Sequence, residues 1–214
     1  MSMPMISQAG LVSKGSSHID PRAGHPKHLD KNGRLRSLAP HLLRQSMSHK
    51  KLINDPLKVA DELVDGLVEA YNGDCIHVGQ RSLVLKQIPA GKVALLVGGG
   101  SGHEPIYHGL VGRNLADGAA CGDIFAAPPP DIVLEATQAV NKGNGVLYLY
   151  GNYAGDVMNF DIGAELAAEE DIDIRTVLIW DDVCSPPPTK KQNRRGIAGL
   201  VPVVKLVGAA SQSA

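Results

Sequence analysis

The chain has 214 residues, of which 43% are hydrophobic and 4% aromatic, and its formal net charge is −1. This length suffices for one α/β domain with a hydrophobic core. The near-neutral charge gives no indication of a nucleic-acid partner, and no apolar run is long enough to span a bilayer. The three cysteines are odd in number and form no CxxC pair, which is typical of reduced thiols in a cytoplasmic protein.

Residues 1–46 differ in composition from the rest of the chain. They are rich in Ser, His, Arg and Lys, contain only two acids, Asp20 and Asp30, and show no periodic apolar pattern. Low hydrophobicity with excess charge predicts a disordered basic tail. Two alternatives stay open: an organelle transit segment, or an extension that precedes a natural start at Met47. We therefore divide the chain into a tail, 1–46, and a domain, 47–214.

The domain begins with a predicted helix. Asp55 and Pro56 are typical of a helix N-terminus, apolar residues then recur at helical spacing, and Asn72-Gly73 indicates its end. Three apolar runs follow, which predict strands buried on both faces of a sheet: 93–97, 146–150 and 174–180. Further helices are expected at 131–140, 159–170 and 197–210. The alternation predicts an α/β fold, a parallel sheet sandwiched by helices.

A glycine-rich loop is expected directly after the first apolar run. It reads Gly98-Gly-Gly-Ser-Gly-His-Glu-Pro105. A P-loop requires Lys after its last glycine, and a dinucleotide fingerprint and a nucleophile elbow both require glycine where His103 stands. Pro105 is incompatible with the helix of a zinc protease. The loop therefore predicts a small-molecule site of another kind at the carboxyl end of a parallel strand.

A second polar loop, Gly151–Asp156, follows the next apolar run. Because carboxyl ends of parallel strands meet at one sheet edge, His103 and Asp156 are expected to converge on one crevice. An imidazole and a carboxylate beside a hydroxylated substrate are suited to general acid–base catalysis. The structural alternatives are that Asp156 caps the following helix and that His103 only hydrogen-bonds its own loop.

A third polar cluster follows the last apolar run. Asp181-Asp182 precedes three prolines and the cations Lys190, Lys191, Arg194 and Arg195. Charge in a proline-rich loop is typical of a solvated surface. The alternative is a site for an anion or for Mg²⁺ at the same sheet edge.

Several motifs together resemble the dihydroxyacetone kinase substrate-binding subunit (DhaK family). They are Lys51–Asp55, Gly91–Pro105 with its Gly-Gly-Gly-Ser-Gly-His-Glu-Pro string, Asp117–Phe125, Asn152–Phe160 and Arg194–Ala198. The resemblance runs from about Met47 to Ala214, and it identifies this segment as the N-terminal portion of such a domain.

The resemblance implies a kinase for short ketoses such as dihydroxyacetone (glycerone) or erythrulose. Gly100, Ser101, Gly102, His103 and Asp156 would bind the substrate, and His103 and Asp156 would be catalytic. The chain itself would bind no cofactor or metal. ATP with Mg²⁺, or a phosphohistidine, would be held by a separate all-helical domain or subunit, and the full-length form would be a cytoplasmic homodimer without nucleic-acid or membrane partners.

Two departures from the family pattern bear on activity. Family members continue into a second half with a histidine that bonds covalently to the substrate carbonyl, and no residue here matches it. Many members also have lysine where this chain has Gly151, which is closer to relatives acting on four-carbon ketoses. The alternatives are therefore a non-catalytic ketose-binding or regulatory module and an inactive truncated fragment.

Overall fold

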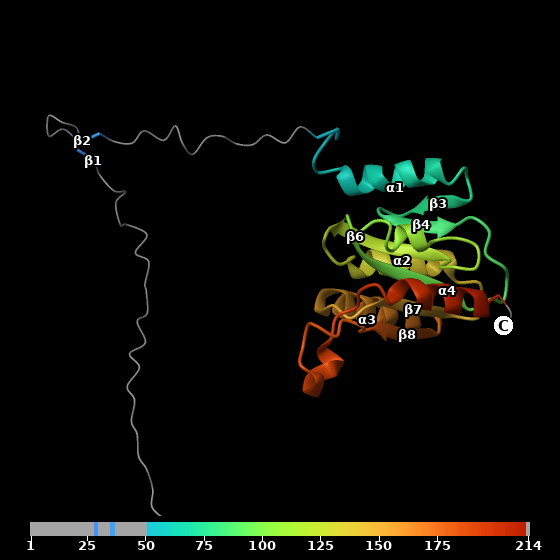
Figure 1. Ribbon diagram of the computed structural model, residues 1–214. Helices are drawn as coiled ribbons and strands as arrows, with labels where there is room; N and C mark the ends of the chain where they lie inside the picture. The colour runs from blue at the N-terminus through green and yellow to red at the C-terminus, as the bar shows by residue number, and fades with distance from the viewer. Residues whose placement is uncertain (1–27, 30–34, 37–50, 213–214) are drawn as a thin grey trace, which may run out of the picture. The chain divides into compact units, whose positions relative to one another are not determined.

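The computed structural model describes residues 28–29, 35–36 and 51–212, and the chain divides into two compact units, 1–51 and 52–214. In the first unit, β1 (His28–Leu29) pairs antiparallel with β2 (Leu35–Arg36). The rest of the predicted disordered tail lies outside the described residues, so its disorder stays a prediction. All other elements belong to the second unit (Figure 1).

The second unit is built on one six-stranded sheet. Its spatial order is β3 (Cys75–Val78), β4 (Ser82–Leu85), β6 (Gly118–Ile124), β5 (Ala94–Ser101), β7 (Val146–Gly151) and β8 (Ile174–Ile179). The last four strands are parallel, and three of them, β5, β7 and β8, correspond to the apolar runs from which a parallel sheet was predicted. The hairpin of β3 and β4 joins β6 antiparallel, so the sheet is mixed.

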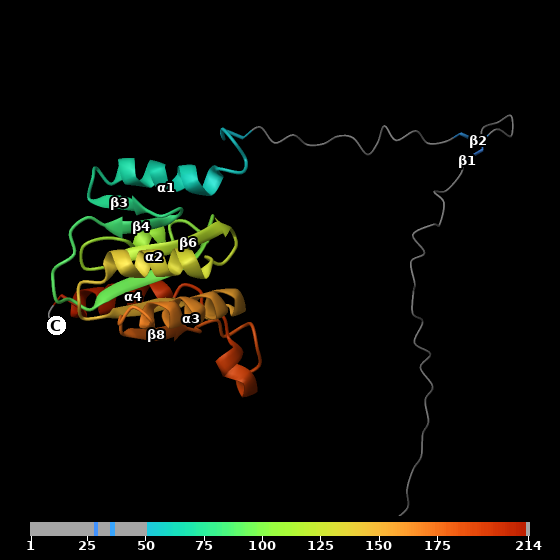
Figure 2. The same cartoon turned by 180° about the vertical axis from the view of Figure 1, so that it is seen from behind.

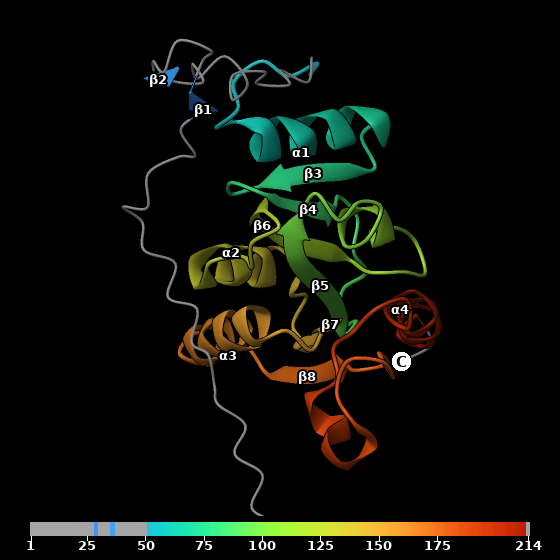
Figure 3. The ribbon, with the colours of Figure 1, turned by 60° about the vertical axis from the view of Figure 1, so that its left-hand side comes forward.

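Helices cover both faces of this sheet. They are α1 (Val59–Ala70), α2 (Pro130–Val140), α3 (Ala154–Ala168) and α4 (Leu200–Ala210), with the short 3-10 helices η2 (His108–Leu110) and η3 (Pro188–Asn193). Helices α2 and α3 lie side by side on one face (Figures 2 and 3), and α1, η2 and α4 contribute to the core of the other face.

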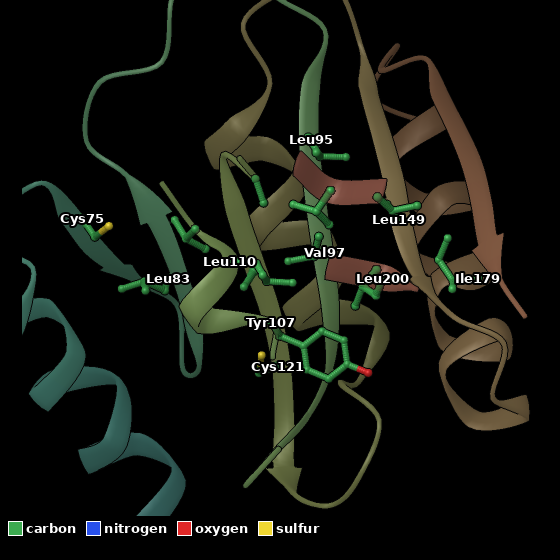
Figure 4. Close-up of a cluster of buried hydrophobic side chains, with 14 of the residues drawn as sticks. Cys75, Leu83, Leu95, Val97, Tyr107, Leu110, Cys121, Leu149, Ile179 and Leu200 are labelled. Carbon is green, nitrogen blue, oxygen red and sulfur yellow. The ribbon is translucent and has the colours of Figure 1, made fainter. Parts of the chain in front are cut away.

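Strand β5 shows how one apolar run supplies both cores. Because alternate side chains point to opposite faces, Leu95 and Val97 pack with Leu200 of α4 (Figure 4), whereas Leu96 packs on the α2 and α3 side. The three β5 side chains Leu95, Leu96 and Val97 are buried. Burying each of them stabilises the fold by about 1.5–3 kcal/mol. The continuous apolar pattern is therefore explained by helices on both faces.

The edge strand β8 departs from its prediction. Arg175, Thr176 and Val177 are exposed, because among the described residues β8 pairs only with β7. The prediction that this run is buried on both faces is wrong. An apolar pattern cannot distinguish a central strand from an edge strand that is half covered.

Three helices begin elsewhere than expected. Helix α4 begins at Leu200, three residues later than predicted. Helix α1 begins at Val59 rather than at Pro56, because Asp55 accepts hydrogen bonds from Leu57 N at its side chain and Lys58 N at its carbonyl, which forms a turn. Helix α3 begins at Ala154, five residues earlier than predicted, and this places Asp156 in its first turn.

Candidate functional site

A cavity of about 630 Å³ opens at the carboxyl edge of the sheet. Strands β5 and β7 pair only from Ala94 to Val97 of β5, and beyond that point the two strands separate. The segment after β5 joins the α4 side of the sheet, and α3, which follows β7, covers the other side. Ligands of open α/β sheets bind at such a switch point. A larger cavity of about 890 Å³ contains none of the predicted site residues.

The first three glycines of the predicted loop lie within β5 rather than after it. A Cβ on Gly98 would clash with the Ala120 carbonyl of β6, and a Cβ on Gly99 would clash with the ring of Tyr107. These glycines permit close packing of the strand. The turn itself falls at Gly102, whose φ of +89° is readily adopted only by glycine.

The structure separates the predicted substrate-binding residues into two groups. Gly100, His103 and Asp156 line the cavity. Ser101 is fully buried, and its hydroxyl donates a hydrogen bond to the Gly122 carbonyl over 2.7 Å. The Gly102 amide donates to Glu104 Oε2 over 2.8 Å, so these two residues hold the shape of the turn.

The ring of His103 has a fixed orientation. Its Nδ1 lies 2.7 Å from the carbonyl oxygen of Gly100, and because a carbonyl can only accept, Nδ1 carries the proton. Edge contacts with the rings of Tyr107 and Phe125, at centroid distances of 6.2 and 5.0 Å, restrain the imidazole further. In the neutral ring, Nε2 is then the free acceptor.

Asp156 is 8% exposed, and its Oδ1 is buried without a hydrogen-bond partner in the described part of the chain. Burial raises the pKa of Asp156 to about 6, although the nearby His103 acts in the opposite direction. The helix N-cap is Tyr153, so Asp156 does not have the predicted capping role. A buried carboxylate oxygen without a partner requires a hydrogen-bond donor, which a sugar hydroxyl would supply.

Other parts of the cavity were not predicted from the sequence. Tyr107, Phe125 and Tyr153 contribute aromatic walls, and Gly196–Ala198 close the side beneath α4. Phe125, Tyr153 and Gly196–Ala198 belong to motifs that carry the family resemblance, although none of them was predicted to line the site. Tyr107 lies outside these motifs, and its position depends on tertiary packing.

Asp181 supports this last wall. Its two carboxylate oxygens accept the backbone amides of Ile197 at 2.7 Å and Gly199 at 2.8 Å. Burial acts in the opposite direction, but these hydrogen bonds hold the pKa of Asp181 below its usual value. These two hydrogen bonds give Asp181 a structural role at the start of α4.

Comparisons with known proteins agree with one another. Residues 65–214 match the family model described as the Dak1 domain. The chain is 44% identical over 167 residues to the PTS-dependent dihydroxyacetone kinase, dihydroxyacetone-binding subunit DhaK, of Lactococcus lactis, covering 77% of this chain and 50% of that protein. It is 42% identical to the L-erythrulose 1-kinase of Mycolicibacterium smegmatis, covering 76% of this chain and 28% of that protein.

Solved structures show the same likeness. The dihydroxyacetone kinase from C. freundii, in complex with AMP-PNP and Mg²⁺, matches with a TM-score of 0.70 at 32% identity, covering 77% of this chain and 31% of that one. The dihydroxyacetone kinase operon co-activator Dha-DhaQ matches with a TM-score of 0.67 at 28% identity. The match covers 72% of this chain and 48% of that one. The chain spans about half the length of the DhaK relative and less of the kinases. With 150 of its 214 residues inside the matched model, the chain belongs to the Dak1 domain family.

Proposed function

We propose that this chain is the substrate-binding part of a dihydroxyacetone kinase-type enzyme, and that a short ketose binds in the cavity between His103 and Asp156. The observation that carries the proposal is the pairing of two free acceptors at one cavity. One is Nε2 of His103, whose Nδ1 is already hydrogen-bonded to the Gly100 carbonyl. The other is the buried Oδ1 of Asp156. A polyhydroxylated substrate donates hydrogen bonds to both.

The two residues would have different roles. Asp156 accepts a hydrogen bond from a ketose hydroxyl and holds the substrate in place. Nε2 of His103 receives the proton of the attacking hydroxyl as that oxygen forms its bond to phosphorus and the bond from phosphorus to the donor breaks. ATP with Mg²⁺, or a phosphohistidine, supplies the phosphoryl group from an all-helical domain or subunit outside this chain.

Gly151 bears on which ketose fits. It lines the cavity wall beside Tyr153 and Gly196, and a Cβ at this position would lie 3.0 Å from the Tyr153 ring. A lysine would therefore displace this wall or extend into the cavity. The glycine supports erythrulose alongside dihydroxyacetone as a substrate, in line with the similarity to an erythrulose kinase.

Three further features belong to the same proposal. The enzyme selects ketones through a covalent histidine that none of these 214 residues matches, it is a homodimer, and it acts in the cytoplasm. Among the described residues, no helix has the length and apolarity needed to cross a membrane.

A second candidate function is a regulatory ketose-binding module. The specific observation in its favour is the structural match to an operon co-activator, which shares this part of the fold. Both functions require ketose binding. They differ in whether the bound ketose is phosphorylated when a donor-carrying kinase domain is added.

Backbone amide NMR of the whole chain during titration with dihydroxyacetone and with erythrulose tests the proposal. We expect saturable shifts at Gly100–His103 and Gly151–Asp156 that disappear in His103→Ala. The matched control is His77→Ala, because His77 bonds Asp65 and Gln80 away from the cavity. A well-dispersed spectrum that responds to neither ketose would contradict both functions.

A further inference from the structure

The connection between β8 and α4 carries a net positive charge, because it contains four cations and two acids, Asp181 and Asp182. Lys190, Lys191, Arg194 and Arg195 lie within six residues, and the sequence contains no Asp or Glu after Asp182. In the described part of the chain, none of these four cations forms an ion pair. A cluster of unpaired cations attracts anions.

The four cations fall into two pairs with different settings. Lys190 and Lys191 belong to η3, which projects from the body of the unit (Figures 1 and 3) and has no buried residue. Arg194 and Arg195 follow η3 and immediately precede Gly196, which lines the cavity. Only the arginine pair is therefore placed beside the candidate site.

The backbone of the arginine pair is held in place by hydrogen bonds. The side-chain amide of Asn152 donates to the Arg194 carbonyl over 2.8 Å, and the Asp182 amide donates to the Arg195 carbonyl over 2.9 Å. The Tyr153 hydroxyl donates to the carbonyl of Gly196 over 2.8 Å. Two of these donors, Asn152 and Tyr153, immediately precede α3, whose first turn contains Asp156. The arginines are thus fixed relative to the candidate catalytic carboxylate.

The side chains themselves are also restrained. The guanidinium carbon of Arg195 lies 5.8 Å from the ring centroid of Tyr153, whose ring belongs to the cavity wall. Arg194 is half buried, and its Nε has no hydrogen-bond partner among the residues described. A buried N–H without an acceptor is unfavourable and rare. The Arg194 Nε therefore indicates a place where an acceptor binds.

We propose that Arg194 and Arg195 form a phosphate-binding rim of the ketose cavity. The planar guanidinium fork matches the oxygen pairs of a phosphate group, whereas a lysine provides only a point charge. The inference rests on the proposed function, because phosphate is the group that such a site must accommodate, either on the donor or on the phosphorylated ketose. It extends that function by naming residues that bind the transferred group rather than the ketose.

The test measures phosphate affinity in the whole chain. Amide shifts are followed with dihydroxyacetone phosphate, and separately with tripolyphosphate, in the unmodified protein, Arg194→Gln, Arg195→Gln and the control pair Lys190→Gln and Lys191→Gln. Each substitution removes one charge from the same connection. We expect each arginine variant to lose about tenfold in affinity, since a hydrogen bond to a charged group is worth about that factor. The lysine variants should change by less than about twofold.

The two probes distinguish the two sources of phosphate. Arginine-dependent binding of dihydroxyacetone phosphate alone assigns the rim to the product phosphate, and arginine-dependent binding of tripolyphosphate assigns it to the donor. Equal losses in the lysine and arginine variants, or phosphate binding that no arginine variant changes, overturn the proposal. Arg195→Lys keeps the positive charge but lacks the planar guanidinium group. This variant controls for misfolding, and it should retain part of the phosphate affinity.

Failure of the proposed function gives a separate result. Unphosphorylated dihydroxyacetone should bind the arginine variants as it binds the unmodified chain, and His103→Ala should abolish this binding. If phosphate binding depends on the arginines and no unphosphorylated ketose binds, the ketose proposal fails and the phosphate rim stands. If ketose binds and phosphate does not, only the rim is overturned.

Discussion

At the scale of single residues, the candidate site depends on two hydrogen-bond acceptors, one on Asp156 and one on His103, that have no partner among the described residues. Each has a fixed position, Asp156 in the first turn of α3 and His103 against the Gly100 carbonyl, and each presents an acceptor to the cavity. The sequence could predict this pair because both residues follow buried strands. It could not predict that Ser101 is engaged by β6, since this depends on the register of β5 with β6.

Asp156 makes stability depend on pH. Its pKa rises from 3.8 to about 6 on folding, so the folded state favours the protonated acid. The contribution of Asp156 to stability is therefore greatest below about pH 4 and falls as the pH rises to about 6, with a total loss of about 3 kcal/mol for a shift of this size. We expect Asp156→Asn to be more stable than the unmodified chain at pH 7.5 by up to this amount, and to lose the advantage near pH 4.

Urea unfolding of the two proteins at both pH values measures this difference. Asp161→Asn is the control, because Asp161 lies on the same helix and is exposed. A variant that is less stable than the unmodified protein at pH 7.5 would mean that Asp156 has partners in solution and is not an unsatisfied carboxylate.

At the scale of elements, the glycines of β5 are required for packing. The apolar run 93–97 predicts the strand, but not its continuation through Gly98–Ser101, because glycine has a low strand propensity and only close neighbours explain it here. Strands β3, β4 and β6 were not predicted, since β3 and β4 are short and β6 consists mostly of small residues buried between β4 and β5.

Two glycine substitutions separate close packing from conformational freedom. Gly98→Ala places a methyl group against the Ala120 carbonyl and the ring of Phe160, and overpacking of this kind costs about 1–3 kcal/mol. Gly66→Ala, in α1, has no atom within 4 Å of the new Cβ and should stabilise the fold by about 0.4–1 kcal/mol. Thermal unfolding of both variants provides the comparison, and equal effects would contradict the packing of β5 against β6.

The start of β5 is joined to β6 by a buried ion pair. Lys92 Nζ lies 2.7 Å from Asp117 Oδ1, the two residues are 5% and 1% exposed, and the Leu95 amide donates to Asp117 Oδ2. Lys92→Met would leave a buried carboxylate without its cation, which costs about 3–5 kcal/mol. Chemical denaturation measures the loss, and the double variant Lys92→Met with Asp117→Asn should recover part of it. No loss in Lys92→Met would show that the pair is solvated.

At the scale of the whole molecule, residues 52–214 form a compact unit of their own. We expect a chain that starts at Met47 to keep the same unfolding midpoint, within about 2 °C, and the same ketose affinity, within about twofold, because neither the core nor the cavity includes a residue from the tail among those described. Calorimetry of the two chains measures this. A lower midpoint in the shortened chain would mean that the tail packs on the domain.

The overall architecture was partly accessible from the sequence. Apolar runs and residues typical of helix ends predicted the central parallel strands and most helices. The resemblance of several motifs predicted the family. The antiparallel hairpin, the exposed face of β8 and the cavity wall at Gly196–Ala198 were not predictable, because they depend on which elements pack together.

The central claim is that His103 and Asp156 bind one ketose together. Calorimetric titration of erythrulose into the unmodified chain, His103→Ala, Asp156→Asn and the double variant measures this most directly. Two residues that contact the same ligand are coupled, so the double variant should lose less affinity than the sum of the single losses, by at least about 0.5 kcal/mol. Additive losses, or an affinity that neither substitution changes, would contradict a shared ketose site.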